Sequence, residues 1–378
     1  MEFLLENTNF EAVAIIDEFE SAIWVERYWE YGDFEFKLAP TRENVLRRFR
    51  DDYYLSTTDS EVEMIIEERL LETDAEDGNW LYVRGRSLES ILDRRIIWAQ
   101  TNLNYSTPKD NPNGLQRAIK KWITDSIIAP TSALADRKID NFIFEDTDDP
   151  VITKIPLKVQ YTGDNLYDVI QYHCQANNLG FKIRRNAQNQ FVFKLYAGVD
   201  HSHEQTENDY VVFSPSYDNI INSNFLESKK VFRNVALVRG EGEGTSRKTA
   251  TVGSGKGLER RELNVDARDI STNSGAITGT KYTNLLKTRG TEKLAEDANK
   301  YVKTFEGQVE QTQSFQYGKD YFMGDVVQIT NEFDIEATTR VIELIRSDAT
   351  DGIDVIVPTF ADPTDPVTPD YDDEDDDT

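Results

Sequence analysis

The chain has 378 residues, of which 38% are hydrophobic and 11% aromatic, so it can bury a core and form two or three domains. Its net charge of −27 argues against tight phosphate binding, which needs clustered Lys and Arg. The single cysteine, Cys174, excludes an intrachain disulfide and a Cys-rich zinc site. The start has no basic n-region, and no run approaches the roughly 18 apolar residues of a membrane span. We therefore expect a soluble protein without a signal peptide.

Residues 10–97 predict mainly β structure. Apolar and polar residues alternate in "FEFKL" at 34–38 and in "EVEMIIEE" at 61–68, which is typical of half-buried strands. An Asp77-Gly78 turn separates the second strand from "LYVRG". An apolar stripe then predicts a short helix over 87–97, formed by Leu88, Ile91 and Leu92.

Residues 103–204 predict a mixed segment with two helices. The first follows Asn113, a predicted N-cap, and its apolar stripe is Leu115, Ala118, Ile119, Trp122 and Ile123. The second is predicted to be capped by Asp164 and ended by Gly180. Its stripe is Leu166, Val169, Ile170, His173 and Cys174. Two alternating strands around an Asn-rich turn follow at 180–195.

Residues 205–360 predict further β structure. Strands are expected in 209–213, 231–240 and 260–265, with a long mobile loop over 240–257, which is rich in Gly, Ser and Thr. A helical stretch is expected over 280–303, broken at Gly290. The last 18 residues hold nine acids and no base, so they predict a solvated acidic tail.

A Gly-Asp pair leads into an alternating strand twice, at Gly32-Asp33 and at Gly324-Asp325. A long strand, an acidic tip with Asp-Gly and a return strand follow each time, and Asp351-Gly352 matches Asp77-Gly78. This order predicts a duplicated β-barrel module. Two unrelated antiparallel hairpins are the alternative, because Asp-Gly suits hairpin turns through its positive φ. Two barrels per chain would let a ring of three chains present six similar modules.

Four blocks of sequence, at 19–40, 81–97, 317–330 and 341–360, resemble a siphovirus tail-protein family. Its members are baseplate-hub or tail-associated proteins of long-tailed phages. The resemblance covers nearly all of 10–360, and "FESAIWVERYWEYGDFEFKLAP" and "GRSL…RRII" are its more specific parts.

The resemblance implies a fold that is mainly β with α+β insertions, in which two related β-barrel modules form a tail-hub-type multidomain fold. The expected division is a barrel module A at 1–102, an α+β part at 103–204, a barrel module B at 205–360 with a helical insertion at about 280–303, and a disordered acidic tail at 361–378. The barrels can be built from discontinuous segments.

The resemblance also implies a structural role in the virion, after synthesis in the host cytoplasm. A homotrimer would cap the distal end of the tail tube, adapt the sixfold tube to a threefold tip and form part of the DNA ejection channel. Its partners would be the distal tail protein, tape-measure protein and fibres or receptor-binding proteins, and DNA would only pass through. The peptidase or lysin domain of larger relatives is not expected, so we predict no enzyme, cofactor or metal.

Several patterns suggest chemistry, and each has a simpler interpretation. His201, His203 and Glu204 could offer three metal ligands, but no fourth follows at a known spacing, which favours a solvated loop. His173 and Cys174 are adjacent on one helix and share its apolar stripe, which predicts a packed core pair.

Two Gly-rich segments resemble a phosphate loop, but 242–249 has Arg247 where the second glycine is required, and 253–257 lacks the spacing and the hydroxyl residue after Lys256. A flexible loop is the expectation there. In the first block, Trp24, Tyr28 and Trp29 could stack on bases or sugars, but they are predicted to be core and interface residues.

Two other functions stay open. A cell-wall hydrolase of the tail tip would use paired carboxylates, yet nothing distinguishes two acids among the 69. A carbohydrate-binding adhesin would use exposed aromatic residues. Neither accounts for the repeated Gly-Asp pattern. The acidic tail either keeps the protein soluble or binds a basic partner.

Overall fold

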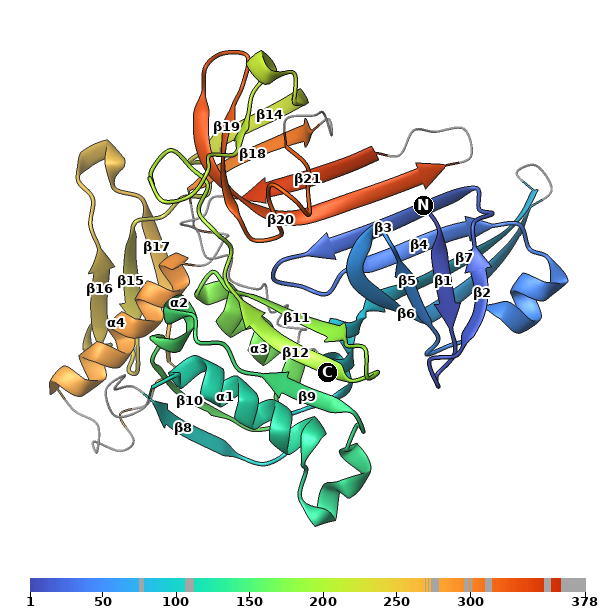
Figure 1. The fold of residues 1–378 in the computed structure, drawn as a ribbon. Coiled ribbons are helices and arrows are strands. Elements are labelled where there is room, and N and C mark those ends of the chain that lie inside the picture. Colours follow the sequence, from blue (N-terminus) through green and yellow to red (C-terminus); the bar gives the residue numbers. More distant parts are fainter. Residues whose placement is uncertain are drawn as a thin grey trace. The chain divides into compact units, whose positions relative to one another are not determined.

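A computed structural model describes residues 1–74, 78–105, 112–268, 270, 272, 279–295, 299, 301–309, 315–349 and 355–361. The chain forms two compact units (Figure 1). Over the described residues, unit 1 comprises 1–223 with 305–361, and unit 2 comprises 224–304. No helix in the described part of the chain is long and apolar enough to cross a membrane. The four-part division expected from the sequence stays a prediction, since compactness alone does not set the limits of a module.

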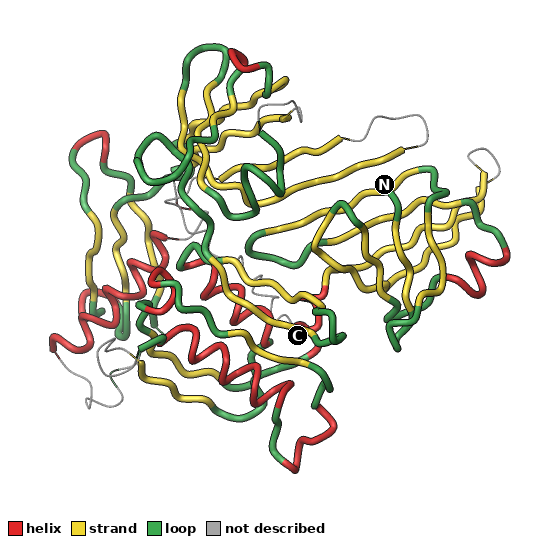
Figure 2. The backbone as a smooth tube through the Cα atoms, viewed as in Figure 1, coloured by secondary structure: helices red, strands yellow, loops and turns green. Residues whose placement is uncertain are grey.

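Unit 1 is built on an 11-stranded sheet, counted over the described residues (Figure 2). The hydrogen-bonded order is β13-β19-β20-β3-β4-β7-β6-β5-β1-β2, and β21 pairs with β20 beside this path. The strands are β1 (Phe3–Glu6), β2 (Ala12–Ile16), β3 (Ser21–Arg27), β4 (Asp33–Leu38), β5 (Tyr54–Thr57), β6 (Ser60–Asp74), β7 (Gly78–Ser87), β13 (Val212–Phe213), β19 (Val326–Thr330), β20 (Glu336–Ala349) and β21 (Val355–Ala361).

The mainly β class is confirmed, but the two separate closed barrels are wrong for the described strands. The path has open ends at β13 and β2, and one sheet contains strands of both expected modules. The physical reason is the length of β20, which has 14 residues. Its first residues pair with β19, and its later residues, from Glu343 to Ala349, pair with β3. One long strand therefore joins the two halves.

The two Gly-Asp regions also differ in their pairing. Both long hairpins form, β6 with β7 and β20 with β21. However, β4 lies beside the return strand β7, whereas β19 lies beside the outgoing strand β20. The expected equivalence of the two sets of strands is thus wrong at the level of pairing. Gly78 has a φ of +85° and opens β7, while Asp77, Asp351 and Gly352 lie outside the described residues.

The segment between the two parts of the sheet contains helices and short sheets. Its elements are β8 (Thr101–Tyr105), α1 (Gly114–Ile123), β9 (Phe142–Glu145), α2 (Pro150–Thr153), β10 (Leu157–Tyr161), α3 (Leu166–Ala176), β11 (Gly180–Arg185) and β12 (Phe191–Tyr196). Short helices complete unit 1, namely η1 (Asn44–Arg48), η2 (Leu88–Arg94), η3 (Thr124–Ile128), η4 (Ser132–Arg137) and η5 (Pro215–Tyr217). The helix predicted over 87–97 is the 3-10 helix η2.

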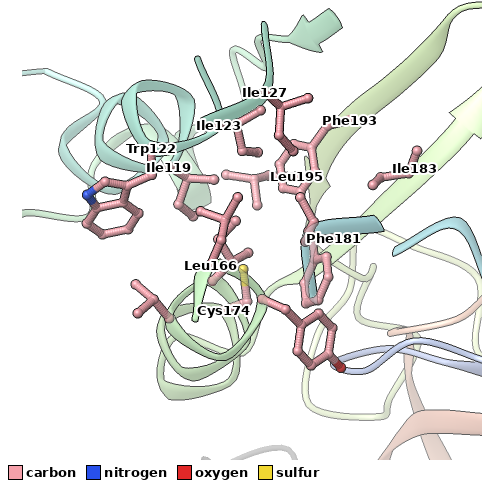
Figure 3. Packing of buried hydrophobic residues seen from close by; sticks show 14 of the residues in the cluster. Ile119, Trp122, Ile123, Ile127, Leu166, Cys174, Phe181, Ile183, Phe193 and Leu195 are labelled. Atoms are coloured by element: carbon pink, nitrogen blue, oxygen red, sulfur yellow. The ribbon is translucent and has the colours of Figure 1, made fainter. Parts of the chain in front are cut away.

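The predicted apolar stripes of α1 and α3 are confirmed, because every residue in them is buried. Figure 3 shows side chains of both helices meeting those of β11 and β12. Each fully buried large apolar side chain contributes roughly 1.5–3 kcal/mol to stability. The labelled residues are Ile119, Trp122, Ile123, Ile127, Leu166, Cys174, Phe181, Ile183, Phe193 and Leu195.

The ends of these helices differ from the prediction by a few residues. Asn113 precedes α1 but has a φ of +62°, and its side chain makes no capping bond. Asn165, not Asp164, caps α3, by accepting from the Tyr167 N–H. The Asp164 carboxylate accepts instead from the Thr162 N–H, which stabilises the turn before the helix. Gly180 does not end α3 but begins β11.

Unit 2 contains a three-stranded sheet and one helix. The strands are β15 (Val235–Arg239), β16 (Thr249–Gly253) and β17 (Glu262–Asp266), and α4 (Gly279–Ala295) packs on β15 and β16. Single turns lie at η6 (Gly244–Ser246) and η7 (Gly257–Glu259). A two-stranded ladder of β14 (Ile220–Ser228) and β18 (Val302–Val309) contains the points where the chain passes between the units.

Two expectations for unit 2 are wrong. The predicted mobile loop over 240–257 contains β16, because Ala250 and Val252 alternate with threonines and pack against the core below α4. Gly290 does not break α4. A Cβ at Gly290 would lie 2.5 Å from Val238 Cγ2 and 2.6 Å from Val252 Cγ2, so this glycine lets the helix approach the sheet.

Candidate functional site

Tyr28 lies where three segments of unit 1 meet. The residue is fully buried, and its hydroxyl donates to the Asn178 carbonyl at 2.9 Å and accepts from the Gly198 N–H at 3.2 Å. The guanidinium carbon of Arg340 lies 5.6 Å from the ring centre. Burial raises the pKa of Tyr28 to about 12, so the hydroxyl keeps its proton. One aromatic side chain thus connects the end of β3, the loop after α3 and β20.

Glycine is required at two places against the Tyr28 ring. A Cβ at Gly324 would lie 2.2 Å from Tyr28 Cε2, and a Cβ at Gly180 would lie 2.5 Å from the same atom. Gly324 also has a φ of +93°, which L side chains rarely adopt. The second Gly-Asp pair therefore begins at a close contact between distant segments.

Asp325 anchors the segment that precedes β13. The carboxylate is buried and accepts from the N–H groups of Val199 and Phe322, both at 2.7 Å. His201 Nε2 lies 3.6 Å from Asp325 Oδ2. Burial raises the pKa of Asp325, and the two N–H bonds oppose this shift. Val326 continues the contact, since it donates to the Val199 carbonyl at 2.9 Å.

The first Gly-Asp pair makes other contacts. The Gly32 N–H donates to Ser87 Oγ and the Ser87 N–H donates to the Gly32 carbonyl, both at 2.8 Å. A Cβ at Gly32 would lie 2.1 Å from the Val25 carbonyl oxygen of the adjacent strand. The half-exposed Asp33 pairs with Arg27, which also pairs with Glu343 of β20 at 2.8 Å. The first Gly-Asp pair therefore stabilises a turn inside the sheet.

A cleft of about 440 Å³ lies beside these two regions. Glu26 on its wall is buried and accepts from the hydroxyls of Ser60 at 2.7 Å and Tyr317 at 3.2 Å. Arg346 lies 3.6 Å from the same carboxylate. Burial raises the pKa of Tyr317 well above its usual value, so this hydroxyl stays a donor. Charged residues such as Glu30 and Lys182 line the cleft together with apolar ones such as Phe181.

Sequence reasoning did not find Glu89, which lines this cleft, or the two acids that pair with Arg185. Glu89 accepts from the Ile183 N–H at 2.7 Å and lies 3.3 Å from an Arg184 nitrogen. Arg185 pairs with Glu6 and, at 3.1 Å, with Glu63, whose pKa is raised by burial. The sequence did contain a signal for the burial of Glu89, because this residue lies between Leu88 and Ile91, two members of a predicted apolar stripe.

The residues considered as metal ligands make separate contacts. His201 Nδ1 lies 2.7 Å from the Asp209 carbonyl, the His203 ring packs edge-on against Tyr210, and Glu204 accepts from the Thr338 hydroxyl at 3.4 Å. Over the described residues, no three His, Cys, Asp or Glu side chains are placed to hold a metal ion.

The prediction of a packed core at His173 and Cys174 is confirmed. Both are buried, and His173 Nε2 lies 2.8 Å from the Tyr161 hydroxyl. Burial lowers the pKa of His173 to about 4 and raises the pKa of the Cys174 thiol. The imidazole is therefore neutral near pH 7, and the thiol is protonated. Trp24, Tyr28 and Trp29 are buried too, as predicted.

The Gly-rich segments of unit 2 form turns around β16. Gly253 has a φ of +84°, and a Cβ there would lie 2.0 Å from the Asn234 carbonyl oxygen. Arg247 donates to the carbonyls of Gly240 and Arg239 and pairs with Asp266. These glycines thus serve the backbone path, and the arginine between them is bound within the unit.

Comparisons with known proteins agree on the kind of protein this chain resembles. A family model described as siphovirus ReqiPepy6 Gp37-like protein matches residues 3–360. No curated protein matches the chain. A 43 kDa tail protein of prophage MuSo2 from Shewanella oneidensis has 11% identity and a TM-score of 0.57, covering 97% of this chain and 100% of that chain.

Two further solved structures have similar folds. The tail protein of Neisseria meningitidis has 13% identity and a TM-score of 0.54, covering 97% of this chain and 99% of that chain. A chain of the Francisella PdpA-VgrG complex has 10% identity and a TM-score of 0.50, covering 98% of this chain and 59% of that chain. At such identities the likeness shows a shared fold.

Proposed function

Because the chain belongs to the siphovirus ReqiPepy6 Gp37-like protein family, we propose that it is the structural hub of a phage tail tip. The fold it shares with phage tail proteins over nearly its whole length supports this role. The observation that carries the proposal is the pairing of β20 with both β19 and β3. This pairing joins two lobes of one sheet within a single subunit. The first lobe is β1–β7, and the second lobe is β13 with β19–β21.

Three copies of such a subunit would place six lobes around an axis. The contacts between neighbours would be head-to-tail, and a threefold rotation closes them into a ring. The lobes differ in strand order, so the six positions would be similar and not identical. Such a homotrimer would cap the distal end of the tail tube and match a sixfold tube to a threefold tip.

The channel of this ring would pass DNA without holding it. The chain carries 69 acids against 42 basic residues. A wall without clustered Lys and Arg gains little counterion-release energy from phosphates. The distal tail protein, tape-measure protein and fibres or receptor-binding proteins would bind the outer surfaces, and the protein would reside at the tail tip of the virion. We also propose the division into modules at 1–102, 103–204 and 205–360, with 361–378 as a tail.

Native mass spectrometry of the purified full-length chain tests the assembly. A trimer is expected, seen in electron micrographs as three-lobed rings with a central hole. The same sample should not retain double-stranded DNA at 150 mM salt, where ionic strength already screens charge beyond about 8 Å. Rings of another symmetry, or monomers at every concentration tested, would contradict the hub.

A second assay separates the hub from a cell-wall hydrolase. The purified protein should leave peptidoglycan intact. Soluble fragments that disappear when two specific acids are replaced by their amides would show instead a carboxylate-based enzyme.

A further inference from the structure

A cationic and aromatic patch lies on the surface of unit 1, formed by Arg95, Ile96 and Trp98 after η2 and by Arg137 at the end of η4. We call it the Arg-Trp patch. Trp98 is 59% exposed and Ile96 is 38% exposed. The guanidinium carbon of Arg137 lies 5.6 Å from the centre of the Trp98 ring. The patch therefore presents a planar cation, an indole and an aliphatic side chain together.

The two arginines of the patch have no acidic partner in the part of the chain that the structure describes. Within the described residues, neither Arg95 nor Arg137 forms an ion pair, whereas the adjacent Arg94 pairs with Asp52 at 2.6 Å and with Glu67 at 3.4 Å. Burial lowers the pKa of Arg95, and the neighbouring charges of Arg137 and Arg94 lower it further. Uncompensated cations are unexpected in a chain with 69 acids and 42 basic residues.

Backbone carbonyls hold the patch in place. Arg95 donates from Nε at 3.3 Å and from Nη2 at 3.1 Å to the Arg137 carbonyl. Arg137 donates from Nη2 to the Ile96 carbonyl at 2.6 Å. Its Nε and Nη1 make no hydrogen bond to other described residues. Nε and Nη1 of Arg137 are thus available to external groups, each as a single charged donor to a carboxylate oxygen.

We propose that the Arg-Trp patch binds an acidic peptide segment that carries an aromatic or proline residue beside its carboxylates. A carboxylate would accept from Arg137, and the apolar residue would pack on Trp98 and Ile96. This inference does not depend on the hub assignment. It concerns one surface of unit 1, whatever the number of subunits.

The charge of the whole chain favours a peptide over nucleic acid. Nucleic-acid binding needs many phosphate contacts along a basic stripe, and the patch offers two arginines in a chain of net charge −27. A short acidic segment needs only one or two such contacts. The sequence at 361–378 has this chemistry, with nine acids, no base, one tyrosine and several prolines.

A binding assay with a defined probe tests the proposal. The probe is a labelled synthetic peptide of residues 361–378, followed by fluorescence anisotropy. The protein is the full-length chain with the nine acids of 361–378 replaced by their amides, so that its own segment does not compete. Binding is expected to weaken at least about 10-fold in Trp98→Ala and in Arg137→Gln. Arg137→Lys should restore part of the affinity, and the exposed Arg42→Gln should leave it unchanged.

Four outcomes would overturn the proposal. The first is no binding, and the second is binding that Trp98→Ala and Arg137→Gln leave unchanged. The third is an equal affinity for a peptide whose acids are amides. The fourth is tighter Arg137-dependent binding of an 18-nucleotide single strand. Circular dichroism of each variant separates lost binding from lost folding, and Trp98→Ala is the safer variant because the indole is largely exposed.

Discussion

Gly32-Asp33 and Gly324-Asp325 have the same two residues before a strand, yet they stabilise different parts of unit 1. At the first pair, Asp33 is half exposed and pairs with Arg27 within the sheet. At the second pair, Asp325 is buried and binds two N–H groups, one of them in the distant segment at Val199. A dipeptide pattern therefore identifies a strand start, while the segment packed against it decides its energetic role.

The largest effect is expected for Gly324→Ala. The new Cβ would lie 2.2 Å from Tyr28 Cε2, at a φ of +93°. Overpacking and backbone strain together should lower the free energy of unfolding by about 4 kcal/mol. Gly163 is the control, because it has a φ of +85° but no atom within 4 Å of its Cβ position. Gly163→Ala should therefore cost only about 1 kcal/mol, from strain alone.

Urea unfolding followed by tryptophan fluorescence measures this difference, since all five tryptophans lie in unit 1. Equal losses in Gly324→Ala and Gly163→Ala would show that the Tyr28 contact has no energetic weight. In that case Gly324 would be needed only for its backbone conformation.

The next largest effect is expected for Asp325→Ala, and it can be compared directly with that of Asp33→Ala. Asp325→Ala should cost about 3 kcal/mol, because it removes a buried carboxylate that accepts from the N–H groups of both Val199 and Phe322. Asp33→Ala should cost at most about 1 kcal/mol, since it removes a half-exposed ion pair. The same urea titrations check both variants. A larger loss in Asp33→Ala would reverse the comparison.

The sequence predicted those features of the fold that depend on local periodicity. The stripes of α1 and α3 are buried as predicted, because helical spacing alone places them on one face. The caps were wrong by one residue at Asp164 and Asn165, where either side chain could accept from an N–H group.

Features that depend on distant segments could not be predicted in this way. The pairing of β20 with β3 joins residues more than 300 positions apart, and no local pattern encodes it. Glycine is unfavourable in helices, which predicts a break at Gly290, but the role of Gly290 is to let Val238 and Val252 approach α4. The burial of Glu89 likewise depends on β11, which supplies the Ile183 N–H.

A smaller effect is expected for Tyr28→Phe. Removing the hydroxyl leaves the Asn178 carbonyl without this donor and the Gly198 N–H without this acceptor. We expect a loss of about 2 kcal/mol. Tyr82→Phe is the matched control, because the Tyr82 ring lies under Arg84 on a half-buried face and the substitution keeps that contact. If Tyr82→Phe lowered the free energy of unfolding as much as Tyr28→Phe, the two hydrogen bonds of the Tyr28 hydroxyl would add no specific stability.

The smallest effect is expected for Asp325→Asn. The free energy of unfolding that this substitution removes should depend on pH. Burial holds the pKa of Asp325 in the folded chain above its ordinary value of 3.8, so the folded state binds more protons than the unfolded state between these two pKa values. The wild-type chain therefore loses stability as pH rises through this window, and the Asn variant does not share this loss. The stability difference between the wild type and Asp325→Asn should decrease from pH 4 to pH 6 in urea titrations.

His201 provides the control for this last measurement. Its charge lowers the pKa of Asp325 across the 3.6 Å separation of Nε2 and Oδ2. In a His201→Gln background that opposing effect is absent, so the decrease between pH 4 and pH 6 should become steeper. A cost of Asp325→Asn that increases with pH would mean that the two N–H bonds outweigh burial. The second Gly-Asp pair would then stabilise unit 1 through a charged carboxylate, as the first pair does through its ion pair with Arg27.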